Sequence, residues 1–145
     1  MNPSVYLSFD FGTQSTGVAV GDDVTCQARP LTRLAMKKGQ PSWNEVDRLV
    51  KQWAPVGFVL GLPLNMDGTE QPFTNKVRRF SRQLMERHPL KIYWADERLS
   101  TIEAKEQLFE AFGKKALMKE KIDAQSAAVI LEQWLLSAQN NQETI

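Results

Sequence analysis

The feature that most constrains the fold is a strand–turn–strand pattern near the start of the chain. Residues 5–11 alternate apolar and polar side chains, which is the two-residue period of a β-strand with one buried face. A turn containing Gly12 and Gly17 separates them from a second apolar run at 18–20, so we expect an antiparallel β-hairpin. Asp10 ends the first strand, where its carboxylate suits either a metal or phosphate site or a turn hydrogen bond to backbone amides.

The composition is that of a soluble globular domain and excludes several kinds of site. Of the 145 residues, 42% are hydrophobic and 24% are charged, and the formal net charge is +1, so any nucleic-acid-binding surface must be local. Cys26 is the single cysteine, which excludes an internal disulfide and a cysteine-rich zinc site. Neither a membrane-spanning run nor a signal-peptide pattern is visible. We expect one domain over residues 1–138, a frayed polar tail at 139–145 and a cytoplasmic location.

The rest of the chain alternates strands and helices. A third strand is expected over 24–34, at a sheet edge because Pro30 removes one backbone donor. The expected elements that follow are a helix over 43–53, a strand at 58–60 buried on both faces, a helix from about 72 to 88, a strand at 91–95, a helix from Ser100 or Thr101 to Gly113, and a last helix over 123–138. This order predicts an α/β fold with a mixed five-stranded sheet flanked by helices.

Four acidic residues are candidates for one site. The first strand and the two later strands at 58–60 and 91–95 are expected to be mutually parallel, so their carboxyl ends lie at one sheet edge, where ligands bind. Asp10, Asp96 and Glu97 should therefore converge there. Asp123 shares the apolar face of the last helix, so it either points into this site or caps the helix.

Such a cluster of carboxylates indicates a divalent metal. Neighbouring carboxylates repel one another unless a cation lies between them. Oxygen ligands without a histidine or cysteine cluster indicate Mg²⁺ or Mn²⁺ rather than Zn²⁺. Two such ions about 4 Å apart can activate a water and stabilise the leaving oxygen of a phosphodiester. His88, the single histidine, is interpreted as a surface residue at a helix end. The pattern predicts a hydrolase, a metal-dependent nuclease.

Several motifs resemble the YqgF/RuvX family over about residues 5 to 136. They are Phe9-Asp10-Phe11-Gly12-Thr13, Gly17-Val18-Ala19-Val20, and the segments at 61–68, 96–104 and 121–127. The family has a ribonuclease H-like fold, which Holliday junction resolvases and transposases also use. Its members are regarded as nucleases that process the 5′ end of pre-16S ribosomal RNA, and they have also been described as Holliday junction resolvases.

The resemblance implies that Asp10, Glu97 and Asp123 are the catalytic and metal-binding acids. It selects Glu97 rather than Asp96, and strand alternation sends these two neighbours to opposite faces. One departure concerns the first turn, where the family often carries a basic residue and this chain has Gln or Ser at 14–15. That departure weakens the phosphate binding expected at the turn.

Basic residues form three groups that could contact nucleic acid. The groups are Lys37 with Lys38; Arg78, Arg79 and Arg82; and Lys114, Lys115, Lys119 and Lys121. The last group precedes Asp123 in the chain and is predicted to contact the phosphate backbone of the substrate. The three arginines are interpreted mainly as the solvated face of their helix.

The resemblance thus implies processing of pre-16S rRNA, free or within a ribosomal particle, by a monomer or a homodimer with no membrane partner. The nearest alternative is a Holliday junction resolvase, which requires a dimer with two sites. A more remote alternative function is that of an actin-like nucleotide-binding module, because residues 10–13 also resemble a phosphate loop of actin-like ATPases. A third is a non-catalytic ribosome-assembly module, although a pure RNA binder has no use for clustered acids.

Overall fold

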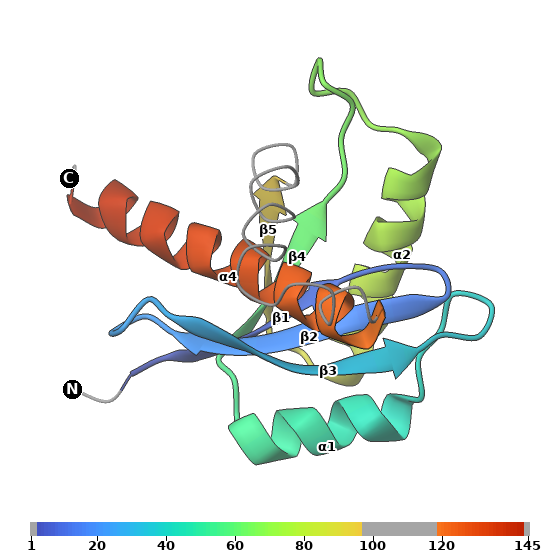
Figure 1. The fold of residues 1–145 in the computed structure, drawn as a ribbon, viewed down its shortest axis with the longest axis horizontal. Coiled ribbons are helices and arrows are strands. Elements are labelled where there is room, and N and C mark those ends of the chain that lie inside the picture. Colours follow the sequence, from blue (N-terminus) through green and yellow to red (C-terminus); the bar gives the residue numbers. More distant parts are fainter. Residues whose placement is uncertain (1–2, 97–118, 144–145) are drawn as a thin grey trace.

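The centre of the molecule is a five-stranded mixed sheet with the strand order β3-β2-β1-β4-β5 (Figure 1). The computed structural model describes residues 3–96 and 119–143, and the side chains of the last helix from 122 to 138. The elements are β1 (Val5–Asp10), β2 (Ser15–Asp22), β3 (Ala28–Ala35), α1 (Trp43–Trp53), β4 (Gly57–Leu62), α2 (Pro72–Arg87), β5 (Lys91–Asp96) and α4 (Lys119–Glu143). Strands β1, β2 and β3 pair antiparallel, whereas β1, β4 and β5 are parallel. The predicted hairpin and mixed sheet are confirmed.

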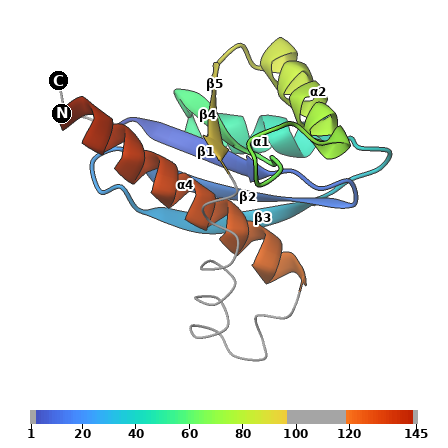
Figure 2. The ribbon, with the colours of Figure 1, turned by 90° about the horizontal axis from the view of Figure 1, so that it is seen from above.

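Helices cover both faces of the sheet, with α4 on one face and α1 and α2 on the other (Figure 2). Alternation along β1 sends Leu7 and Phe9 into the core beneath α1 and α2. Tyr6 takes the opposite direction and meets Trp134 of α4, with ring centroids 5.0 Å apart. Each fully buried large side chain stabilises the fold by about 1.5–3 kcal/mol. Among the described residues, no helix is both long enough and apolar enough to pass through a bilayer.

The central strand β4 is buried on both faces, as its continuous apolar sequence predicts. Phe58 and Leu60 join the core beneath α1 and α2, whereas Val59 joins the cluster beneath α4, and all three are fully buried. Helices on both sides exclude water from such a strand.

Strand β3 lies at the sheet edge, as predicted from Pro30, but it begins at Ala28 and not at residue 24. The reason is a turn that Asp22 stabilises. Its carboxylate accepts hydrogen bonds from the backbone N–H groups of Val24 at 3.0 Å and Thr25 at 2.8 Å. Such a turn consumes the residues that we expect to continue the strand.

Helix α4 begins four residues before Asp123 and extends to Glu143, whereas the sequence predicts a helix over 123–138. Asp123 therefore lies inside the helix, and its interpretation as an N-cap is wrong. The helix expected from residue 100 or 101 to 113 lies outside the described residues.

Helix α2 confirms the helix predicted from about 72 to 88 but corrects the role of one arginine. Phe80 and Leu84 are buried in the core. Arg78, expected on the solvated face, is half-buried with its guanidinium carbon 5.3 Å from the centroid of the Trp94 ring. It also forms an ion pair with Glu70. The long arginine side chain covers apolar surface while its charged end stays paired.

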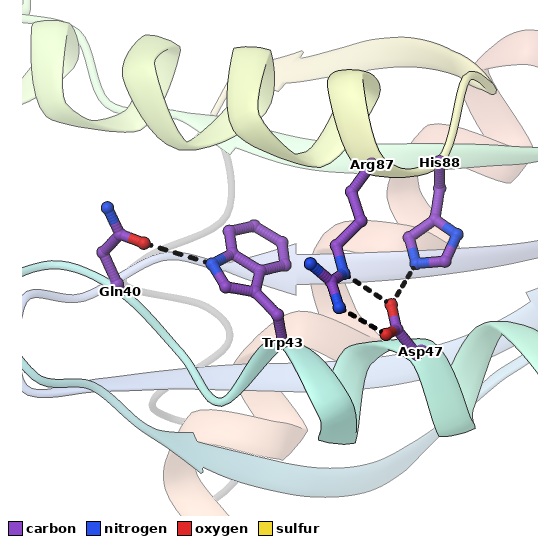
Figure 3. Close-up of polar contacts among 5 residues, drawn as sticks. All are labelled: Gln40, Trp43, Asp47, Arg87 and His88. Atoms are coloured by element: carbon purple, nitrogen blue, oxygen red, sulfur yellow. Dashed lines mark hydrogen bonds and ion pairs between the residues drawn. The ribbon is translucent and has the colours of Figure 1, made fainter.

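Helices α1 and α2 are joined by a charged contact around Asp47 (Figure 3). Arg87 donates two hydrogen bonds to the carboxylate of Asp47, at 2.8 and 2.7 Å, and His88 Nε2 lies 2.7 Å from Oδ1. His88 is thus half-buried and paired, which corrects its interpretation as a surface residue. The hydrogen bonds from Arg87, followed by that of His88, hold the pKa of Asp47 at about 2, below its usual 3.8.

Because the pKa of Asp47 is lower in the folded state, its ionised form stabilises the fold above about pH 4, and this contribution disappears as the pH falls toward 2. We predict that Asp47→Asn lowers the free energy of unfolding at neutral pH and that the difference from wild type shrinks between about pH 4 and 2. Urea unfolding across this range measures it. Glu86→Gln, an exposed acid beside Arg87, is the control. A difference that does not change with pH would contradict the prediction.

Candidate active site

Three residues form a row across strands β1, β2 and β3 on the face covered by α4. In the sheet register, Asp10 lies opposite Gly17, and Gly17 lies opposite Arg33. Asp10 shares its face with Ser8, whose hydroxyl donates to the backbone carbonyl of Ala127 in α4 at 2.8 Å. The middle position of the row has no side chain, which leaves room above the sheet.

Helix α4 fills that room with its own backbone. A Cβ atom on Gly17 would lie 1.8 Å from the carbonyl oxygen of Asp123 and 2.9 Å from the backbone nitrogen of Ala124. Real Cβ atoms never approach backbone so closely, so only glycine allows this contact. Adjacent strands are about 4.8 Å apart. Asp123 therefore lies above the middle of the row, between the strand of Asp10 and the strand of Arg33.

The carboxylate of Asp123 is held by two neighbours. Its Oδ2 accepts a 2.5 Å hydrogen bond from the hydroxyl of Ser15, and the Nε of Arg33 lies 3.5 Å from the same oxygen. The Asp123 and Arg33 side chains are only 22% and 26% exposed, so water screens their attraction less than at an open surface. Neither neighbour is predicted as a site residue from the sequence. The strand register that places Arg33 opposite Gly17 is not visible in the sequence, because the pairing of β2 with β3 shifts between Val18 and Ala19.

Asp96 lies on the other face of the sheet. Along β5, Tyr93 and Ala95 pack on the α4 side, whereas Ile92 and Trp94 pack on the α1 and α2 side. Asp96 has the parity of Trp94, so it does not share the face of the row. This placement agrees with its exclusion from the predicted set of acids.

The remaining predicted site residues are placed only in part. Glu97, Lys114 and Lys115 lie outside the described residues, and Lys119 and Lys121 lie in the first turn of α4 with side chains that are not described. In the described part of the chain, no three histidine, cysteine, aspartate or glutamate side chains gather around one point. Two of the three predicted acids are thus placed at the same end of one sheet face, and the set of three stays a prediction.

Replacement of Gly17 tests this packing. Gly17→Ala should destabilise the protein by about 3 kcal/mol, at the upper end of overpacking costs, because the methyl group forces the α4 backbone away from the sheet. Gly39→Ala is the comparison, since a Cβ there meets nothing within 4 Å and only the φ of +77° opposes it, at about 1–2 kcal/mol. Urea unfolding measures both. A Gly17→Ala variant as stable as wild type would show that α4 does not rest on this residue.

Comparison with solved structures confirms the fold. The chain superimposes on Thermus thermophilus RuvC with a TM-score of 0.53 and 13% identity, and on T. thermophilus RuvC in complex with Holliday junction substrate with a TM-score of 0.55 and 14% identity. In both cases 94% of this chain and 96% of the other are covered. At this identity the likeness shows a shared ribonuclease H-like fold, as predicted.

Sequence comparison identifies the family. A protein of Sodalis glossinidius is 52% identical over 129 residues, covering 89% of this chain and 92% of its own length. One from Pectobacterium carotovorum is 51% identical over 134 residues, covering 92% and 96%. Both are named "Putative pre-16S rRNA nuclease". The family model RuvX, described as Holliday junction resolvase, matches residues 4–137. The chain therefore belongs to the RuvX family of nucleases.

Proposed function

We propose that this protein is a divalent-metal-dependent nuclease that hydrolyses a phosphodiester bond at the 5′ end of pre-16S rRNA. Asp10, Glu97 and Asp123 are its catalytic acids. The observation that carries the proposal is the position of Asp123, seated on Gly17 and held by Ser15 and Arg33 at the strand end that bears Asp10. The names of the relatives supply the substrate.

The donor atoms in this region fit Mg²⁺ or Mn²⁺. Both described contacts of the Asp123 carboxylate are made at its Oδ2 atom. Its Oδ1 atom is therefore the oxygen that we assign to the cation. Asp10 supplies a second carboxylate from the adjoining strand, and Glu97 is proposed as the third. Hard oxygen donors of this kind are the ligands that both cations prefer. The bound cations supply activation of a water and stabilisation of the leaving oxygen.

The chain itself orients these acids. The hydrogen bond from Ser15 and the guanidinium of Arg33 fix the rotamer of Asp123, and both partners lie on strands of the packed sheet. Arg33 also offsets the negative charge of Asp123. Arg33 and Ser15 are therefore positioning residues, since they act through Asp123.

The other parts of the proposal rest on the sequence. Residues 1–138 form one nuclease domain in the cytoplasm. The Lys114, Lys115, Lys119 and Lys121 group contacts the RNA backbone. Resolution of a four-way DNA junction is the second candidate, because the matching family model is described as a resolvase, and it would require a dimer with two sites.

Cleavage assays test the proposal. Wild-type protein is expected to cut a 5′-extended small-subunit rRNA precursor with Mg²⁺ and not with EDTA. Asp10→Asn, Glu97→Gln and Asp123→Asn should each reduce cleavage at least about 100-fold, since several kcal/mol of transition-state stabilisation are lost. Asp96→Asn, on the opposite face, should cut normally. Preferential cutting of a four-way DNA junction would support the resolvase instead, and an acid variant with normal activity would remove that residue from the site.

A second assay tests the role of Ser15. Ser15→Ala removes a hydrogen bond to a carboxylate, which is worth about 1.5–3 kcal/mol, so kcat should fall about 10- to 100-fold. KM should change little because Ser15 acts through Asp123. Ser15→Thr retains the hydroxyl and should recover most of the activity. Equal losses for alanine and threonine would argue against the positioning role.

A further inference from the structure

A basic pocket lies beside the turn that follows Asp10, on the face of the sheet that α2 covers. It has a volume of about 420 Å³, and its lining includes Lys38, Lys76 and Arg79. None of the described residues that line it is acidic. Three cations in a lining without a described acidic residue give the pocket a positive potential that favours an anion.

The wall that carries Lys38 is a tight hairpin of defined shape. Lys38 and Gly39 both adopt the left-handed conformation, with φ of +53° and +77°. The backbones of Lys37 and Gln40 exchange two hydrogen bonds, of 2.8 and 3.0 Å, around them. Two consecutive left-handed residues inside such a pair form a compact turn. The hairpin therefore holds Lys38 at its tip.

The other walls are joined to this hairpin. The backbone N–H of Met36 donates to the carbonyl of Gln14 at 3.0 Å, which ties the hairpin to the β1–β2 turn. Lys76 and Arg79 lie one turn apart on α2, and both are exposed. Phe80, which is only 1% exposed, anchors the same part of α2 in the core. The three cations thus project from fixed backbone, although their side chains reach solvent.

The pocket and the acids share one end of the sheet. The β1–β2 turn, the β3–α1 connection and the start of α2 lie on the same side of the molecule (Figures 1 and 2). The turn residues Thr13 and Gln14 line the pocket, and they link the strand of Asp10 to the strand of Ser15. A nucleic-acid strand that leaves the acids across this turn meets the pocket next.

We propose that this pocket binds backbone phosphates of the substrate strand beyond the bond that is cut. The inference rests on the proposed nuclease function. Residues 14–15 of the turn carry no charge, so the positive charge beside the turn comes from Lys38, Lys76 and Arg79. Phosphates neutralised by lysine and arginine contribute affinity without base specificity. The pocket holds the strand in place while the acids perform the chemistry.

Binding measurements with a cleavage-deficient protein test the proposal. Lys76→Gln/Arg79→Gln in an Asp10→Asn background is titrated by fluorescence anisotropy with a labelled single-stranded fragment of the rRNA extension. Affinity should fall at least about tenfold, and the slope of log K against log salt should decrease by about 1.4, or 0.7 for each lost contact. Arg48→Gln/Lys51→Gln, the same charge change at exposed positions of α1, should bind like the parent.

The outcomes separate the pocket from general electrostatics and from the nuclease function. Equal losses in both double variants, or no loss in the pocket variant, would overturn the proposal. Lys38→Gln, which leaves α2 unchanged, should weaken binding in the same direction if the helix variant folds poorly. In the active protein, Lys76→Gln/Arg79→Gln should raise KM and preserve kcat. A wild-type protein that cuts no substrate would contradict the nuclease function, whereas the anisotropy result would still decide on the pocket.

Discussion

The close packing of α4 on the sheet is the constraint on which the candidate site depends. Small residues line this contact: Ala127 and Ala128 of the helix pack on Ala19 of β2, and Gly17 touches the helix backbone itself. Because only small side chains separate the helix from β2 at this point, Asp123 comes close enough for Ser15 and Arg33 to reach its carboxylate. A wider separation would leave this acid without its partners.

At one end of the sheet, the candidate acids and the basic pocket lie on opposite faces. Strand alternation sends Asp10 to the face of α4, and the turn after it connects directly to a pocket on the α2 side. The acids and the cations of that pocket therefore lie on opposite faces of the sheet at the same sheet end. A formal net charge of +1 conceals this local separation. Such a separation suits the proposed nuclease function, in which acids and a polyanionic substrate share one region.

Some expectations are wrong for identifiable physical reasons. Asp123 has the chemistry of an N-cap, but α4 begins at Lys119, so the residue lies within the helix and its side chain is available to the sheet. Arg78 falls on the polar side of its helix, but an aromatic neighbour from β5 covers its guanidinium. His88 is half-buried because α1 supplies Asp47 as a partner. For Arg78 and His88 a neighbour from another element overrides the local pattern, whereas for Asp123 the helix begins earlier than that pattern indicates.

Sequence alone determined the elements that depend on local chemistry. The hairpin, the edge position set by Pro30 and the doubly buried strand at 58–60 all follow from periodicity and from backbone donors, which are properties of neighbouring residues. The placement of acids at strand ends follows in the same way. Only the tertiary structure revealed the contacts of Arg33 with Asp123 and the gathering of Lys38 with Lys76 and Arg79. These depend on the register between β2 and β3, which shifts between the pairs Val18–Thr32 and Ala19–Pro30, and on how closely each helix approaches the sheet. Such distances are set by packing between segments far apart in the chain.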